Sequence, residues 1–334
     1  GPPGASPLTT PSSRQPTVRA MKAFFCPTFE LPLPEGHAFP MAKYRGLYER
    51  VRDNADAWGI TLHEPVSTSD EALRRVHCPE YIERVRRGTL SASEQRRIGF
   101  PWSEAMARRA RRTVGGTIAA LDAALRGDGI AANLAGGTHH AAFDRGGGYC
   151  VFNDSVVAAR HAQAEGLARR LLIVDLDVHH GNGTAELVAE DDTLFAFSMH
   201  DAKNYPAIKP ASDLDIPLPP GTDDARYLDL LAHHLPRAID AARPDAVIYL
   251  AGADPYLGDR LGQLALTKTG LAQRDRFVFD TCARFGLPLS VAMAGGYAPD
   301  VEDIVDIHAE TVRLASRSAC AAMTACQPIR ATPA

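Results

Sequence analysis

The chain has 334 residues, enough for one large α/β domain or for two smaller domains. Hydrophobic residues make up 45% and charged residues 23%, which is the composition of a globular protein rather than a disordered or fibrous one. With 36 basic and 40 acidic side chains the net charge is −4, and no apolar run reaches the roughly 18 residues of a membrane span. We therefore expect neither a nucleic-acid partner nor membrane insertion.

The two ends of the chain differ in composition from its middle. Residues 1–20 are rich in Pro, Ser and Thr, and we expect a tag or leader there, with an opening Gly-Pro like a protease scar and Met21 as the natural start. From Met21 the composition is uniform, which favours a single domain over 21–318 and a tail over 319–334. Six cysteines without a C-x-x-C pair predict no disulfide framework and indicate a reducing compartment, the cytoplasm.

Four short apolar runs predict buried strands, and helical patterns separate them. The strands are expected at Gly129–Leu134, Leu171–Val178, Ala246–Leu250 and Leu287–Met293. The helices are expected after Ser103 and over Asp154–Arg169, Asp223–Ala242, Lys268–Phe285 and Pro299–Leu314. This alternation predicts an α/β fold with a single parallel β-sheet sandwiched between α-helices, although closure into a barrel fits the same pattern.

Two clusters of basic side chains in the predicted helices have a structural explanation. The run Arg108–Arg112 contains four arginines and is predicted to be a solvated helix face. His233 and His234 lie inside a helical pattern, away from any strand end, and are predicted to be a surface pair.

The strongest sign of chemistry is a D-x-D-x-H pattern. Alternate residues of a strand share a face, so Asp175, Asp177 and His179 are expected to project together. Two carboxylates and an imidazole on a buried strand are costly without a cation, and Asp and His are zinc ligands. Asp254 follows another strand and is the natural third ligand. The alternative is that the aspartates cap strand ends or form a salt-bridge network.

Further candidate residues follow other strand ends, where ligands bind in open α/β sheets. His139 and His140 come after a Gly-Gly turn, and imidazoles suit acid–base work near neutral pH. Tyr297 follows Gly295 and Gly296, a turn expected to be flexible, although a core aromatic would fit equally well. Cys150 is expected to be buried rather than nucleophilic. The chain has no P-loop and no G-x-S-x-G serine-hydrolase motif.

In this combination the sequence resembles the zinc-dependent histone deacetylase superfamily, which includes acetylpolyamine amidohydrolases and acetoin-utilisation proteins. The resemblance runs from about Met21 to Leu314. The segments that carry it are Leu33–Pro40, Val76–Tyr81, Gly136–His140, Asp144–Cys150, Asp175–Gly183, Gly252–Asp254, Gly258–Gly262 and Gly295–Tyr297. Asp144–Cys150 and Gly258–Gly262, with a short loop after His200, are most similar to the class IV branch and its bacterial relatives.

The resemblance implies an arginase-deacetylase fold, a three-layer α/β/α sandwich, and two kinds of cation. Zinc, or ferrous iron in the cell, would be held by Asp177, His179 and Asp254. A structural potassium would be held by backbone carbonyls and one hydroxyl, at Asp175, Asp177, His179, Met199 and Ser198.

The resemblance also implies a role for each candidate residue. His140 would be general base to a metal-activated water, oriented by Asn182, and His139, oriented by Asp175, would stabilise charge and protonate the leaving amine. Tyr297 would donate a hydrogen bond to the scissile carbonyl. The residues lining the channel for the lysine stem would be Gly148 and Tyr149. Asn182 stands where many members have Asp, and Tyr149 where Phe is common, so the pKa of the general base and the polarity of the channel are expected to differ.

The expected activity is removal of acetyl or longer fatty-acyl groups from the lysine ε-amine of proteins or peptides, and the class IV resemblance favours the longer groups. An acetylpolyamine deacetylase is the main alternative, although the dimerisation insertion of such enzymes is not evident between His200 and Asp215. A ureohydrolase would require two manganese ions and further aspartates. A catalytically inactive scaffold of the same fold is disfavoured because every expected group is present. The oligomeric state stays open.

Overall fold

The structure, a computed structural model, describes residues 19–325. Most of the expected leader over 1–20 and of the expected tail over 319–334 falls outside this range, so both remain predictions. Within residues 19–325, every helix falls short of the length or the apolar character that crossing a bilayer requires.

Eight parallel strands form one sheet in the order β2-β1-β3-β8-β7-β4-β5-β6. Their bounds are β1 Met21–Phe24, β2 Ile60–His63, β3 Ile130–Asn133, β4 Leu171–Asp175, β5 Leu194–Asp201, β6 Leu214–Leu218, β7 Ala246–Leu250 and β8 Leu289–Ala292. The strands β2 and β6 stand at opposite edges and do not pair within the described range, so the sheet is open rather than a closed barrel.

The four predicted strands are confirmed as β3, β8, β7 and β4, which are the four neighbouring strands in the middle of the sheet. The four flanking strands had not been predicted. Strand β1 begins at Met21, directly after the expected leader, and β6 carries Pro217, which a sheet tolerates at an edge strand. Strand β4 ends at Asp175, three residues before the predicted end at Val178.

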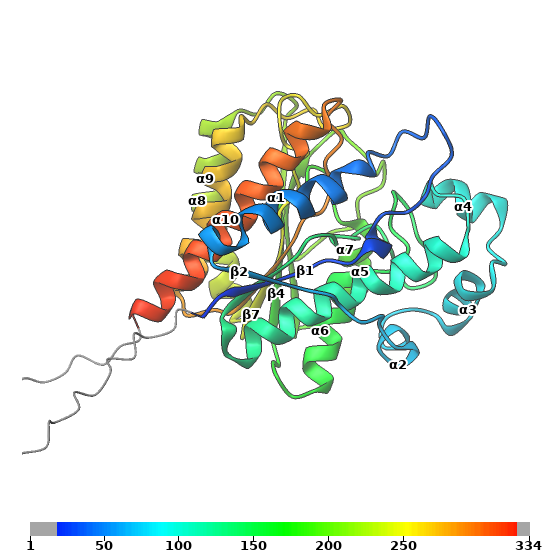
Figure 1. The fold of residues 1–334 in the computed structure, drawn as a ribbon, viewed down its shortest axis with the longest axis horizontal. Helices are drawn as coiled ribbons and strands as arrows, with labels where there is room; N and C mark the ends of the chain where they lie inside the picture. The colour runs from blue at the N-terminus through cyan, green and yellow to red at the C-terminus, as the bar shows by residue number, and fades with distance from the viewer. Residues whose placement is uncertain (1–18, 326–334) are drawn as a thin grey trace, which may run out of the picture.

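Helices cover both faces of the sheet (Figure 1). On one face lie α1 Ala42–Trp58, α8 Asp224–Ala242, α9 Lys268–Arg284 and α10 Val301–Ala325. On the other lie α5 Glu104–Ala123, α6 Asp154–Ala164 and α7 Asn182–Val188. Three short helices extend from the same end as the start of α5: α2 Asp70–Arg74, α3 Pro79–Arg87 and α4 Ala92–Ile98. Two single turns complete the set, η1 Pro27–Phe29 and η2 Ala124–Asp128.

Helix starts were predicted better than helix ends. The predicted starts of α5, α6 and α9 are confirmed. The residues before them, Ser103, Asn153 and Thr267, are N-caps, because each side chain accepts a hydrogen bond from a backbone N–H in the first turn. Several predicted helix bounds were wrong. Helix α8 is capped by Asp223 and starts one residue later than expected, and α6 stops before Gly166, which has a φ of 69°. Helix α10 begins at Val301 instead of Pro299 and continues past Leu314 to Ala325.

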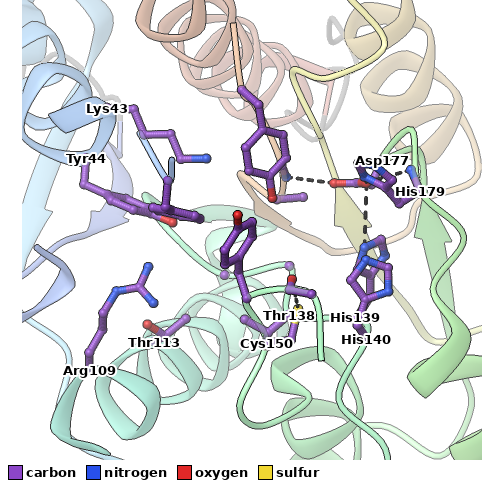
Figure 2. Close-up of a pocket in the computed structure, with 18 residues that line it drawn as sticks. Lys43, Tyr44, Arg109, Thr113, Thr138, His139, His140, Cys150, Asp177 and His179 are labelled. Carbon is purple, nitrogen blue, oxygen red and sulfur yellow. Dashed lines mark hydrogen bonds and ion pairs between the residues drawn. The ribbon is translucent and has the colours of Figure 1, made fainter. Parts of the chain in front are cut away.

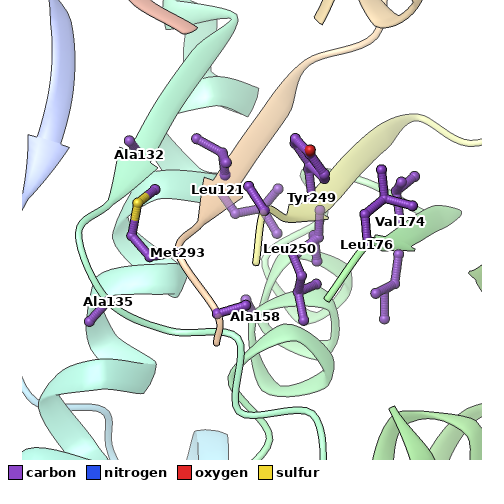
Figure 3. Close-up of a cluster of buried hydrophobic side chains, with 14 of the residues drawn as sticks. Leu121, Ala132, Ala135, Ala158, Val174, Leu176, Tyr249, Leu250 and Met293 are labelled. Atoms are coloured by element: carbon purple, nitrogen blue, oxygen red, sulfur yellow. The ribbon is translucent and has the colours of Figure 1, made fainter. Parts of the chain in front are cut away.

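The core is built on the central strands. All five residues of β4 and all five of β7 are buried, as expected for strands that helices cover on both faces. Figure 3 shows side chains of the strands and of their C-terminal extensions, among them Val174, Leu250 and Met293, packed with Leu121 of α5 and Ala158 of α6. Truncating one such side chain typically costs about 2–5 kcal/mol. This packing fixes the positions of the C-terminal ends of the central strands, from which the site loops extend.

Candidate active site

Loops that follow the central strands meet around a pocket of about 40 Å³ (Figure 2). The predicted site residues that line this pocket are His139, His140, Gly148, Tyr149, Asp177, His179 and Tyr297. Three others, Asp175, Asn182 and Asp254, contact these residues from behind. The sheet thus brings together side chains that lie more than a hundred residues apart in the chain.

Asp177, His179 and Asp254 form a compact buried group. One oxygen or nitrogen of each lies within 4.8 Å of the others, a separation suited to a shared metal ion. The expectation that Asp175, Asp177 and His179 share a strand face was wrong, because β4 ends at Asp175. The convergence arises in the loop, where the His179 N–H donates to Asp177 Oδ1 at 2.8 Å, while Asp175 turns toward His139.

The donor atoms of this group fit a divalent cation. Asp254 Oδ1 accepts from the Val178 N–H at 2.9 Å, whereas its buried Oδ2 has no hydrogen-bond partner among the described residues. Burial lowers the pKa of His179, but Asp177 and Asp254 outweigh burial and raise that pKa to about 10. The carboxylates therefore favour a positive charge at this position. Two carboxylate oxygens and one imidazole nitrogen are a zinc donor set, and a bound metal would replace the imidazole proton.

Glycine is required at position 295 because a side chain there would clash with the carboxylates of Asp177 and Asp254. The expected reason, a flexible turn, does not apply. Neither Gly295 nor Gly296 has a positive φ, so the turn does not depend on the conformational freedom of glycine. A Cβ at Gly295 would lie 2.1 Å from Asp254 Oδ2 and 2.7 Å from Asp177 Oδ2. The Gly295 N–H also donates to Asp177 Oδ2 at 2.8 Å. Glycine lets the backbone approach both carboxylates.

His139 is held in its charged form. Its Nδ1 donates to Asp175 Oδ2 at 2.5 Å, and the side chain is almost fully buried. Burial lowers the pKa of His139, but Asp175 and Asp177 outweigh burial and raise the pKa to about 9. An imidazolium in this position can stabilise negative charge and donate a proton.

The neighbouring His140 is held in its neutral form. Burial, together with the charges of His139 and His179, places the pKa of His140 well below its ordinary value. His140 Nδ1 donates to Asn182 Oδ1 at 2.7 Å, and an amide oxygen only accepts, so Nε2 keeps its lone pair. The two rings lie with centroids 4.2 Å apart yet their pKa values move in opposite directions. Such a pair is suited to one acid and one base.

Tyr297 presents a protonated phenol to the same pocket. Burial and the charge of Asp177 raise its pKa well above the ordinary value, so the hydroxyl remains a hydrogen-bond donor. The Tyr297 backbone N–H donates to Asp259 Oδ2 at 2.8 Å, and its ring centroid lies 6.3 Å from that of His179. The interpretation of Tyr297 as a core aromatic accounts for its burial but not for its position in the pocket wall.

The pattern for the histone deacetylase domain matches residues 37–312. The chain belongs to the histone deacetylase family. An uncharacterized protein of Picosynechococcus sp. is 45% identical over 282 residues, covering 84% of this chain and 94% of that protein. Histone deacetylase 2 of Arabidopsis thaliana is 32% identical over 278 residues, covering 78% of this chain and 70% of its own length.

Solved structures confirm the fold expected for a deacetylase-family chain. The HD domain of HDA15 superposes with a TM-score of 0.73 at 23% identity, covering 91% of this chain and 95% of that domain. An acetylpolyamine aminohydrolase from Burkholderia pseudomallei superposes with a TM-score of 0.69 at 22% identity, covering 87% and 97%. The predicted three-layer arginase-deacetylase architecture is therefore confirmed.

Two cations in the pocket of this deacetylase-family chain were missed. The expectation that Arg108–Arg112 is a solvated face was wrong for Arg109, which is buried, donates from Nε to Phe29 O at 2.8 Å and lines the pocket. Lys43 of α1 is also buried in the pocket wall. In Figure 2 both point into the pocket from the side opposite to Asp177 and His179. The spacing of Lys43 from Leu47, four residues along the apolar face of a helix, was the available signal.

A second, outer hollow of about 300 Å³ shares His140, His179, Gly148, Tyr149 and Tyr297 with the inner pocket and opens outward. Gly148 has a φ of 50° and Tyr149 a φ of 66°. A Cβ at Gly148 would lie 2.5 Å from His140 Cδ2, so only glycine fits beside that imidazole. Tyr205, absent from the sequence-based set, adds a ring centroid 4.9 Å from that of His140.

Of the remaining predicted residues, Cys150 lines the inner pocket and the potassium candidates lie in or just after β4 and β5, whereas His233 and His234 lie on α8. Asp175 of β4 pairs in register with Ser198 of β5, and Met199 is the next residue of β5. The other two potassium candidates, Asp177 and His179, lie in the loop that follows β4. Cys150 is buried as expected, and burial raises the pKa of its thiol, which makes it a poor nucleophile. His233 is exposed and His234 half-buried on α8, far along the chain from any strand end.

Proposed function

We propose that this chain is a zinc-dependent deacylase that removes acyl groups from the ε-amine of lysine in proteins or peptides. One observation carries the proposal: a single pocket holds a buried Asp-His-Asp group, two imidazoles with opposed pKa shifts and a protonated tyrosine. Membership of the histone deacetylase family supports hydrolysis of an acylated amine. An inactive scaffold would have no need of this complete set.

Asp177, His179 and Asp254 would hold the catalytic metal. When bound there, zinc lowers the pKa of water and polarises a carbonyl. Ferrous iron accepts the same oxygen and nitrogen donors and is the alternative in the cell. We also propose a structural potassium at carbonyls of Asp175, Asp177, His179 and Met199 and at the Ser198 hydroxyl, supported by the pairing of β4 with β5.

The two histidines would divide the proton transfers. Neutral His140 would take a proton from the attacking water at Nε2, while Asn182 holds its Nδ1–H in place. Positively charged His139 would stabilise the developing negative charge and then donate a proton to the leaving lysine amine. Asp175 would keep His139 charged and oriented throughout.

Tyr297 would stabilise the oxygen of the scissile carbonyl. Its phenol stays protonated in the buried pocket and so can donate a hydrogen bond as negative charge develops. A donor aimed at an oxyanion is typically worth about 10²–10³ in rate. Gly148 and Tyr149 would line the channel that takes the lysine stem.

The inner pocket favours a short acyl group. Its volume of about 40 Å³ is small beside the roughly 300 Å³ of the outer hollow, and its walls include the cations Lys43 and Arg109. We therefore propose acetyl as the preferred group, although the class IV resemblance favours long fatty-acyl chains. The size and charge of the pocket both disfavour a long alkyl chain.

The test is kcat/KM on three matched substrates: an acetyl-lysine peptide, its long-chain acyl counterpart and an acetylated polyamine. Each is measured with and without a chelator, and zinc is added back as the control. We expect the acetyl-lysine peptide to be preferred and its turnover to be abolished by chelation. Preference for the polyamine would overturn the substrate class, and absence of turnover on all three would favour the scaffold.

A further inference from the structure

The mouth of the outer hollow carries a net positive charge. Its lining contains two side chains with a permanent charge, Arg96 and Arg97, and no carboxylate. Both arginines are exposed at the C-terminal end of α4. The rest of the mouth is formed by uncharged side chains that include Asn204, Tyr205 and Leu261. A substrate that reaches His140 and Tyr297 through this hollow passes beside the arginines.

The backbone fixes this position. Helix α4 ends at Ile98 and is capped by Gly99, which has a φ of 88°, and the chain there is hydrogen-bonded to the channel wall. The Gly148 N–H donates to Arg97 O at 3.0 Å, and the Tyr149 N–H donates to Ile98 O at 2.7 Å. The Cγ of Arg97 and the hydroxyl of Tyr205 both lie within 4 Å of the Cβ position of Gly147. The backbone of Arg97 is therefore held against the channel wall and is not part of a free surface segment.

Neither guanidinium is neutralised by a partner. In the described part of the chain, no carboxylate lies within 4.0 Å of Arg96 or Arg97. Glu94, on the same helix, is engaged elsewhere: it pairs with Arg84 at 2.8 Å and accepts from the Ser91 N–H at 2.8 Å. The positive charge of the two arginines is thus directed at solvent and at the hollow.

Other charged groups near the mouth do not reverse this balance. Arg260, next to Leu261, is exposed and donates to Ala38 O at 3.1 Å. Lys209 Nζ donates to Asn204 O at 2.7 Å and so braces the loop that carries Tyr205. Two acids on this side are turned into the protein. Asp259 accepts from the backbone N–H groups of Leu261, Gly262 and Tyr297, and the fully buried Asp201 accepts from Asn204 Nδ2 at 3.2 Å.

We infer that the mouth selects acyl-lysine peptides whose neighbouring residues are acidic or uncharged, and disfavours cationic amines such as acylated polyamines. The inference rests on the proposed deacylase function and specifies its substrate class. Unpaired arginines attract carboxylates and repel ammonium groups, and these effects weaken as salt screens them. Basic side chains in the last turn of a helix also stabilise the helix dipole, which is the competing explanation for both arginines.

The first test uses the unmodified protein. Three acetyl-lysine peptides, identical except for Glu, Gln or Lys on either side of the modified lysine, are compared with an acetylated polyamine. We expect kcat/KM to fall in the order Glu, Gln, Lys, with a spread of about 3- to 20-fold at low salt that narrows at high salt. The polyamine is expected to be the poorest substrate.

The second test reverses the charge. The double variant Arg96→Glu/Arg97→Glu is expected to prefer the Lys peptide over the Glu peptide, and turnover of the Gln peptide reports that it is folded. Arg284→Glu is the matched control, because Arg284 is also exposed in the last turn of a helix but lies just before the start of β8, whereas the pocket lies where the strands end. This control should keep the wild-type order.

The possible outcomes distinguish a failure of the charge selection from a failure of the proposed deacylase function. Equal kcat/KM for the three peptides would overturn the charge selection and leave the deacylase function standing. An unchanged order in the double variant would likewise overturn it, because the arginines would then not be the cause. Preference for the polyamine over every peptide, or no turnover of any substrate, would overturn the proposed function together with the inference.

Discussion

Lys43 Nζ donates a hydrogen bond of 3.0 Å to the carbonyl oxygen of Gly296, the residue before Tyr297. The ammonium group also lies 5.0 Å from the centroid of the Tyr297 ring. Lys43 is 3% exposed and has no carboxylate partner among the described residues. A buried cation in this place ties helix α1 to the turn that positions the phenol.

Replacing Lys43 with Met should therefore lower kcat on an acetyl-lysine peptide by about 10²-fold, because small displacements of a catalytic group have effects of this size. Zinc content should not change, since Lys43 makes no contact with the Asp-His-Asp group. Lys43→Arg should restore part of the activity, and Lys22→Met, at the half-buried ion pair with Asp128, is the control. An unchanged kcat in Lys43→Met would show that the hydrogen bond does not position Tyr297.

Tyr297 and Asp177 should separate chemistry from metal binding. Tyr297→Phe removes only the donor, so it should retain zinc and lose about 10²–10³ in kcat. Asp177→Ala removes a ligand and should lose the metal as well as the activity. Zinc analysis of both purified variants, combined with turnover, checks this pair. Full turnover by Tyr297→Phe would contradict the role assigned to the phenol.

The pH dependence should report the environment of His140. Its pKa lies well below the ordinary value of 6.5, and the neutral ring is the active form, so kcat/KM should hold at pH 6.5 and fall only at lower pH. A bound cation would lower that pKa further, which keeps the same direction.

Replacing Asn182, the hydrogen-bond partner of His140, should shift the pH at which kcat/KM falls on the acid side of the profile, its acid limb. In Asn182→Asp a carboxylate would stabilise the imidazolium, raise the pKa of His140 and shift the loss of activity to higher pH. Asn182→Ala, which removes the partner without adding charge, should lower kcat without that shift toward higher pH. If the limb of Asn182→Asp coincides with that of the wild type, His140 is not the base that titrates.

Apolar periodicity was sufficient to predict the centre of the sheet, because β3, β4, β7 and β8 are short buried runs bounded by turns. It was also sufficient to place the candidate residues at one edge, since parallel strands end together. The convergence of Asp177 with His179 could not be predicted correctly from strand alternation, because it is made in a loop. Arg109 was misjudged because its local composition is that of a solvated surface, whereas its burial depends on the distant Phe29 carbonyl.

Arg274 of α9 holds the two loops that carry Asp177 and Asp254. It is fully buried, pairs with Asp275 and donates to Gly252 O at 2.7 Å and Leu176 O at 3.3 Å. Arg274→Met should lower the free energy of unfolding by about 3–5 kcal/mol, because one partner of a buried ion pair is left alone. It should also weaken zinc retention, as measured by metal analysis after dialysis.

A neighbour on the same helix provides the control for Arg274. Arg276 is exposed on α9, and Arg276→Met should change the free energy of unfolding by no more than about 0.5 kcal/mol. Urea unfolding of both variants measures the difference. Equal stability of the two would show that the Arg274 network is not needed to hold the loops.

The most direct test of the central claim is a zinc titration of metal-depleted protein, followed by turnover of an acetyl-lysine peptide. We predict that activity is absent without metal, rises in proportion to added zinc and reaches its plateau at one zinc per chain. Asp254→Ala should stay inactive over the same range. Full activity in the metal-depleted protein, or no activity at one zinc per chain, would contradict the assignment of this site as a zinc-dependent deacylase.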